Sequence, residues 1–132
     1  SRLVALLNHP TAGTALHTPV LRLLGNLASA DPSGLSPEQS ETMTAIILHS
    51  HALRALAGLV AQPDCKKGIL KEVCWIASNV AASATEAATA ALIGSNLASS
   101  MIAIVSGTSH AFEVRREAGW ALANASMAAS DR

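Results

Sequence analysis

Short stretches rich in alanine and leucine alternate along the chain with breaks at proline, glycine and serine. Alanine and leucine favour helices, and Pro10, Pro63 and the Ser-Gly-Thr-Ser run at 106–109 interrupt them. Residues three or four apart lie on the same face of a helix, so apolar residues at these offsets can be buried together. The pattern predicts an all-α chain with helices at about 2–8, 15–29, 41–49, 51–61, 66–83, 85–94, 96–106 and 111–128.

The predicted helices repeat with a period of about 42–45 residues. Trp75 and Trp120 are 45 residues apart, as are Asn79 and Asn124, and each pair lies in the third helix of a three-helix unit. Three helices in a unit of this length is the armadillo arrangement, whose units stack into a right-handed superhelical solenoid. We expect a partial repeat at about 1–30, a repeat with a loop insertion near 31–38 at 31–83, and a repeat at 84–132.

The third helices carry the same stripe of side chains twice. The spacing Glu-x-x-Trp-x-x-x-Asn occurs at Glu72, Trp75 and Asn79, and again at Glu117, Trp120 and Asn124. A weaker copy lies upstream, where Arg22 takes the tryptophan position, Asn26 takes the asparagine position and Pro19 replaces the glutamate. On a helix these offsets place a carboxylate, an aromatic ring and an amide on one face.

Composition and charge narrow the classes of function. Nine basic residues balance nine acidic ones, which argues against direct binding of nucleic acid. No apolar run reaches the length of a membrane span. Cys65 and Cys74 have no zinc-binding spacing, and His49 and His51 are better explained by a helix junction than by a metal site. No catalytic triad or phosphate-binding loop is present, so we expect neither an enzyme nor a cofactor.

The predicted third helices resemble those of the importin-α family, which carry the pattern Glu-x-x-Trp-x-x-x-Asn. The family also has a repeat in its C-terminal half with the pattern Leu-Arg-x-x-Gly-Asn, which 21–26 matches directly ahead of two tryptophan-bearing repeats. The resemblance implies a nuclear-import adaptor that shuttles between cytoplasm and nucleus and binds basic nuclear-localisation peptides at the minor cargo site. It also implies importin-β as a partner of the full-length protein, through a segment outside these 132 residues.

The resemblance implies a peptide-binding role for Arg22, Asn26, Glu72, Trp75, Asn79, Glu117, Trp120 and Asn124. The asparagine amides would hold an extended peptide backbone, because an amide both donates and accepts hydrogen bonds. The indoles would pack on a Lys or Arg stem for about 0.5–2 kcal/mol, and the carboxylates would meet its charge for about 0.2–1 kcal/mol. Arg22 would turn against a carboxylate or carbonyl of the peptide.

Other interpretations of the stripe stay open. The asparagines could bond between adjacent repeats instead of to a ligand. The chain could be an armadillo scaffold for another extended peptide, acidic or hydrophobic, with no role in transport, or a purely structural part of a larger solenoid. The paired glutamates favour a basic ligand, because they would repel an acidic one.

The ends of a solenoid without polar capping repeats expose apolar surface. We expect such surface on the last helix and, at the other end, near Leu3, Val4, Leu6 and Leu7. Surfaces of this kind could pair end to end between copies of the chain.

Overall fold

Helices form every regular element of the described residues, which are 2–7, 14–28, 38, 51–82 and 86–130 of the computed structural model. The helices are α1 (Arg2–Leu7), α2 (Thr14–Ala28), α4 (Ala52–Val60), α5 (Lys67–Ala82), α6 (Glu86–Gly94), α7 (Leu97–Ser106) and α8 (Phe112–Ser130). The all-α armadillo fold predicted from the sequence is confirmed, and each of these helices begins and ends within two residues of its predicted bounds. The predicted helix at 41–49 lies outside the described residues, as does the loop near 31–38 except for Glu38.

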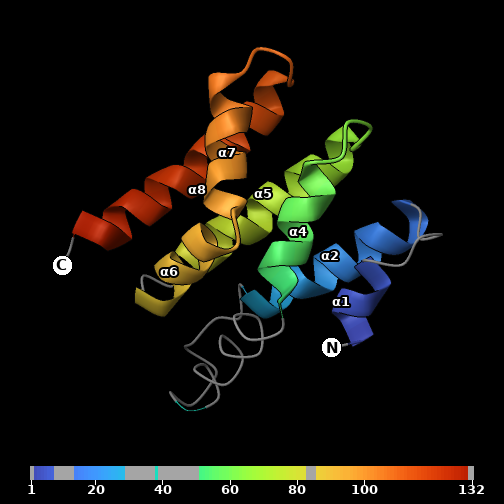
Figure 1. Ribbon diagram of the computed structural model, residues 1–132, viewed down its shortest axis with the longest axis horizontal. Coiled ribbons are helices and arrows are strands. Elements are labelled where there is room, and N and C mark those ends of the chain that lie inside the picture. Colours follow the sequence, from blue (N-terminus) through green and yellow to red (C-terminus); the bar gives the residue numbers. More distant parts are fainter. Residues whose placement is uncertain (1, 8–13, 29–37, 39–50, 83–85, 131–132) are drawn as a thin grey trace.

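Two layers of helices stack along the solenoid (Figure 1). The long helices α2, α5 and α8 lie side by side, with α5 in the middle contacting both neighbours. The helices α1, α4 and α7 form the second layer, in which α4 contacts both α1 and α7. The third helix of each unit therefore contributes to one continuous surface.

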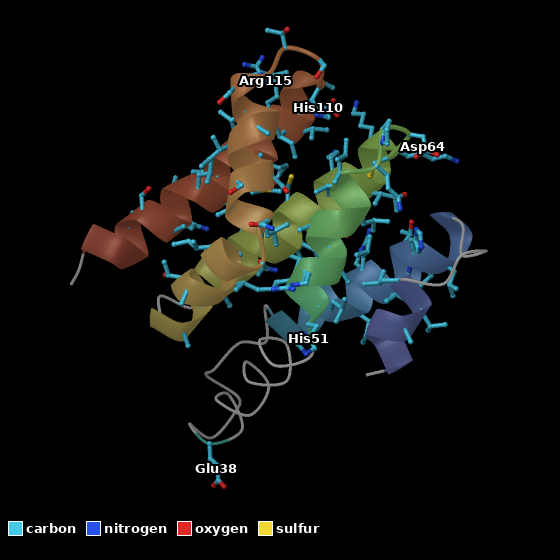
Figure 2. All side chains as sticks on the ribbon, in the orientation of Figure 1. Glu38, His51, Asp64, His110 and Arg115 are labelled. Carbon is cyan, nitrogen blue, oxygen red and sulfur yellow. The ribbon has the colours of Figure 1, made fainter. Side chains whose placement is uncertain are left out.

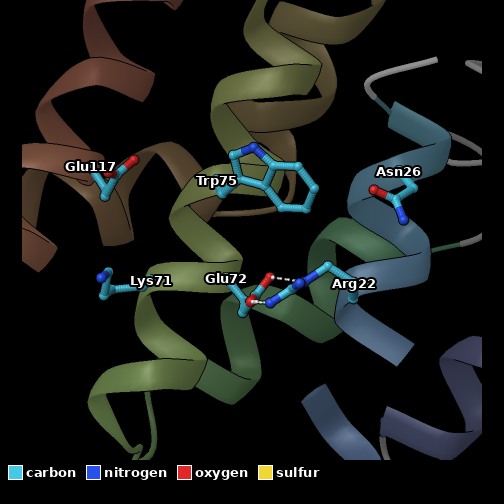
Figure 3. A pocket seen from close by; sticks show the side chains of 6 residues that line it. All are labelled: Arg22, Asn26, Lys71, Glu72, Trp75 and Glu117. Atoms are coloured by element: carbon cyan, nitrogen blue, oxygen red, sulfur yellow. Dashed lines mark hydrogen bonds and ion pairs between the residues drawn. The ribbon is translucent and has the colours of Figure 1, made fainter. Parts of the chain in front are cut away.

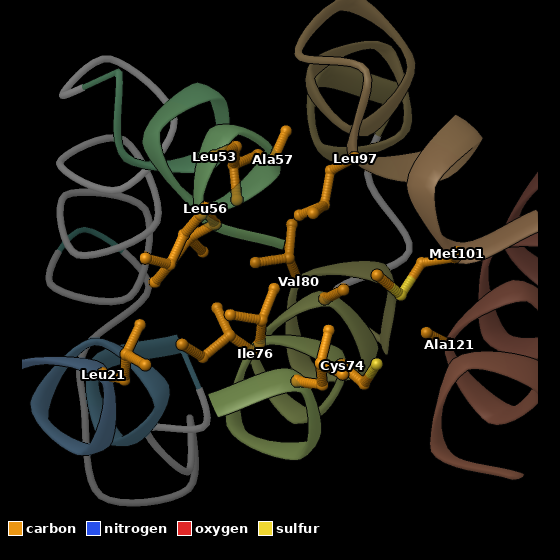
Figure 4. Packing of buried hydrophobic residues seen from close by; sticks show 14 of the residues in the cluster. Leu21, Leu53, Leu56, Ala57, Cys74, Ile76, Val80, Leu97, Met101 and Ala121 are labelled. Carbon is orange, nitrogen blue, oxygen red and sulfur yellow. The ribbon is translucent and has the colours of Figure 1, made fainter. Parts of the chain in front are cut away.

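The core lies between these layers and runs through all the units. Ile76 and Val80 of α5 face Leu56 of α4 and Leu97 of α7, while Met101 of α7 points into the core toward α5 (Figure 4). All of these side chains are buried. Because each unit buries its apolar face against the next, the position of the third helices is set by packing along the whole length.

The junction before the second helix of a unit has the same backbone in two repeats. His51, directly before α4 (Figure 2), has φ 59°, and Asn96, directly before α7, has φ 66°. Both residues are in the left-handed region, and they are 45 residues apart. The interpretation of His51 as part of a helix junction is confirmed, whereas His49 lies outside the described residues.

Apolar side chains are exposed at both ends of the solenoid, with one correction. Phe112 and Met127 of the last helix are 72% and 67% exposed, as expected. Leu6 is 36% exposed, but the expectation for Leu7 is wrong: it is 5% exposed, because α1 packs on α2 and α4 and turns this residue into the core. The side chains of Leu3 and Val4 are not among those that the structure describes.

No single helix among the described residues has both the length and the hydropathy needed to cross a membrane. The segments Ala87–Gly94 and Leu97–Ser106 meet that requirement only together, and they are bent by 68° at the break between them. Cys74 is fully buried in the core, and this burial raises the pKa of its thiol to about 12. Cys74 is therefore a neutral thiol at neutral pH.

Candidate functional site

An open hollow of about 460 Å³ lies over the layer of third helices (Figure 3). It is lined by Arg22, Asn26, Lys71, Glu72, Trp75 and Glu117. These side chains come from α2, α5 and α8, so the hollow extends across three consecutive units. Five of the eight side chains predicted to bind a peptide line the hollow, and the other three lie on α5 and α8 beside it.

Trp75 lies against α2 because residue 25 has no side chain. A Cβ added to Gly25 would lie closer than 3.0 Å to three carbons of the Trp75 indole, a separation that real Cβ atoms essentially never show. The indole is half-buried in this position and forms part of the floor of the hollow (Figure 3). Gly25 is therefore required for the close approach of α2 and α5 at this level.

Trp120 occupies the same position in the next unit but is 64% exposed. The residue equivalent to Gly25 is Ser78 on the preceding third helix, α5, and it has a Cβ and a hydroxyl. Since a Cβ at Gly25 would collide with Trp75, the side chain of Ser78 leaves no matching space for Trp120. The two tryptophans thus differ in role, with Trp75 packed between helices and Trp120 projecting from α8.

Asparagines tie α5 to α2 and α8 to α5. The Asn79 amide donates to the carbonyl oxygen of Gly25 at 3.4 Å, and the Asn124 amide donates to the carbonyl oxygen of Ser78 at 3.3 Å and to its hydroxyl at 3.0 Å. This is the bonding between adjacent repeats that the sequence left open as an alternative. Within the described part of the chain, the side-chain carbonyls of Asn79 and Asn124 accept no hydrogen bond. An amide can therefore bond between repeats and still accept a hydrogen bond from a ligand.

Arg22 and Glu72 form an ion pair between α2 and α5. The guanidinium donates from Nη2 to Glu72 Oε1 at 2.6 Å and from Nε to Oε2 at 3.4 Å, so both carboxylate oxygens are engaged (Figure 3). The Glu72 side chain is only 16% exposed, and the hydrogen bond and charge of Glu72 raise the pKa of Arg22. The carboxylate that Arg22 was expected to meet on a peptide is supplied here by the chain itself.

Glu117 is the carboxylate of the hollow with the weaker ion pair. Its nearest cation is Arg116 on the same helix, at 3.9 Å between Nη2 and Oε1, and 30% of its side chain is exposed. A contact of this length between adjacent residues at the surface holds the carboxylate weakly. Glu117 is therefore better placed than Glu72 to receive a cation from outside.

Sequence reasoning missed Gly25 and Lys71. The signal for Gly25 was its place directly before Asn26, where the carbonyl that Asn79 bonds is located. Lys71 directly precedes Glu72 and was given no role from the sequence, yet it lines the hollow.

Comparison with known proteins gives a partial match. No protein-family model matches the chain. Over 81 residues, or 61% of its length, the chain is 37% identical to importin subunit alpha-1a of Oryza sativa subsp. japonica. The matched segment is 13% of that protein, so the chain corresponds to a small part of its relative. The similarity relates the chain to a part of importin-α and supports the armadillo fold seen in the structure.

Proposed function

We propose that this chain is a fragment of a nuclear-import adaptor of the cytoplasm and nucleus, and that its groove binds the basic nuclear-localisation peptide of a cargo protein. The supporting observation is the hollow across α2, α5 and α8, in which an indole and a carboxylate lie together. A Lys or Arg stem packs on the indole face while its charge reaches the carboxylate. The peptide lies extended across the third helices, and the amides of Asn26, Asn79 and Asn124 hold its backbone.

The spacing of the helices suits an extended peptide. Packed helices are about 8–10 Å apart, and an extended chain advances about 3.3 Å per residue. A peptide that crosses α2, α5 and α8 therefore meets a new helix about every three residues. The cation is held between Trp75 and Trp120 beside Glu117, and the first unit, with Arg22 in place of tryptophan, ends the cation-binding part of the groove.

Titration of a short lysine-rich peptide, followed by tryptophan fluorescence, tests the proposal. We expect a saturable change in emission, because both indoles lie at the proposed site, and we expect binding to weaken with added salt. A peptide of the same length with glutamate in place of lysine is the control. Binding of the acidic peptide, with no response to the basic one, would instead favour an armadillo scaffold with no transport role.

A second test removes the cation that competes for Glu72. In Arg22→Gln the Glu72 carboxylate loses its partner on α2, so we expect a short basic peptide to bind about two- to five-fold tighter, as for one partly exposed ion pair. Arg54→Gln, an equal change of charge on the exposed face of α4, is the matched control and should leave the affinity unchanged. Weaker binding by Arg22→Gln would show that this guanidinium holds the peptide itself.

A further inference from the structure

Two lysines of α5 pair with a single carboxylate of α8, and one of them, Lys71, lines the hollow. Glu113 Oε2 on α8 lies 2.7 Å from Lys67 Nζ and 3.8 Å from Lys71 Nζ on α5. The hydrogen bond from Lys67, followed by the charges of Lys67, Lys71 and Arg116, lowers the pKa of Glu113. All of these side chains are substantially exposed, so a ligand can reach the cluster.

The charges of the hollow and this cluster do not favour cationic ligands alone. Among the described residues, the cations that form ion pairs in the hollow and the cluster are Arg22, Lys67, Lys71 and Arg116, and their carboxylate partners are Glu72, Glu113 and Glu117. Each carboxylate already has a cation within 4.0 Å, and cations exceed carboxylates by one. A purely basic peptide would therefore add positive charge to a surface that is not negative.

Lys71 is the cation of the cluster that also lines the hollow. It projects from α5 on the side toward Glu117 of α8, and both residues line the same open space (Figure 3). Its contact with Glu113 is the longer of the two lysine contacts, and 42% of its side chain is exposed. Arg115, in contrast, is directed to the carbonyl of Val105 and faces α7.

We propose that the groove recognises a peptide of mixed charge, in which an acidic residue that pairs with Lys71 lies near the basic residue that pairs with Glu117. The inference rests on the proposed function and names a further feature of its ligand. The acidic residue lies about two or three residues from the basic one, because the two partners are on neighbouring helices about 8–10 Å apart and an extended peptide advances about 3.3 Å per residue. Neutralising Lys71 leaves Glu113 paired with Lys67.

Two peptides that differ only in charge test this inference on the intact chain. Each has a central pair of lysines, flanked at two and three residues on both sides by glutamine in one peptide and by glutamate in the other. We expect the glutamate peptide to bind about two- to five-fold tighter, the range of a partly exposed ion pair, and we expect the gain to shrink with salt.

Lys71→Gln should abolish the preference for the glutamate peptide, whereas Lys66→Gln, outside the hollow, should retain it. Lys71→Glu should bind a third peptide, with lysine at the same flanking positions, more tightly than the glutamate peptide. Equal or weaker binding of the glutamate peptide, or a preference that survives Lys71→Gln, would overturn the inference and leave the proposed function standing. Failure of both peptides to bind would instead remove the proposed function and the inference with it.

Discussion

Gly25→Ala is expected to lower the free energy of unfolding by about 1–3 kcal/mol, the usual cost of adding a methyl group to a well-packed contact. The added Cβ would lie closer than 3.0 Å to three carbons of the Trp75 indole. That ring belongs to a different helix and packs against the core cluster, so it cannot turn aside as the end of a flexible chain would. Either the indole leaves its rotamer or α2 moves away from α5.

The sign of this effect is informative because helix propensity acts in the opposite direction. Alanine is favoured over glycine inside a helix by about 0.5–1 kcal/mol, so Gly25→Ala would stabilise the chain if the site were open. Gly58→Ala in α4 is the matched control, because a Cβ there meets nothing within 4 Å. Urea unfolding should show Gly25→Ala destabilised and Gly58→Ala unchanged or stabilised. A stabilised Gly25→Ala would mean that Trp75 does not pack on α2.

Emission of Trp75 gives a second measure of the same contact. Displacing a half-buried indole from α2 exposes it to water, so the fluorescence of folded Gly25→Ala should shift to longer wavelength. The exposed Trp120 reports the background, since its surroundings are unchanged. A Trp120→Phe background would isolate the signal of Trp75.

The helices could be predicted from the sequence because their signals are local. Proline, glycine and serine breaks delimit the alanine-rich stretches, and the 45-residue interval between Trp75 and Trp120 places the third helices in register. The same interval relates His51 to Asn96, whose left-handed backbone recurs at the same junction. Helix periodicity and internal repeats can both be recognised in a single sequence.

The pairing of side chains between units could not be predicted in this way. Arg22 and Glu72 are 50 residues apart, and which carboxylate the guanidinium meets depends on how two helices are offset. The same applies to Gly25, whose importance lies in a ring that approaches from α5. The stripe of eight residues was assigned from a repeated spacing, which treats the two tryptophan-bearing copies alike. In the structure these two copies differ, because Trp75 packs on α2 whereas Trp120 is exposed.

The difference in burial between Trp75 and Trp120 decides which of them is the better test of ligand binding. Removing Trp75 would disturb the contact between α2 and α5 together with any ligand contact. Trp120 is 64% exposed, so its removal costs little buried surface and the chain should stay folded. A loss of affinity in Trp120→Ala can therefore be assigned to the ligand.

Trp120→Ala is expected to weaken a basic peptide by about 0.5–2 kcal/mol, which is about two- to thirty-fold in affinity. Glu117→Ala should cost less, about 0.2–1 kcal/mol, because its carboxylate is partly exposed and screened by water and salt. Anisotropy of a fluorescein-labelled peptide measures both variants without depending on the tryptophan that is removed. The difference between them should widen with salt, since stacking on an indole is screened less than an ion pair.

Phe112→Ala is the matched control for this comparison. Phe112 is the chain's other exposed aromatic residue on α8, at 72% exposure, and it lies about two turns before Trp120. Its loss should leave the affinity for the peptide unchanged if the indole holds a cation stem at the groove. Equal losses for Trp120→Ala and Phe112→Ala would indicate general adhesion to an apolar helix face. Equal losses for Trp120→Ala and Glu117→Ala would show that charge contributes as much as stacking, because the two contacts are then worth the same free energy to the bound peptide.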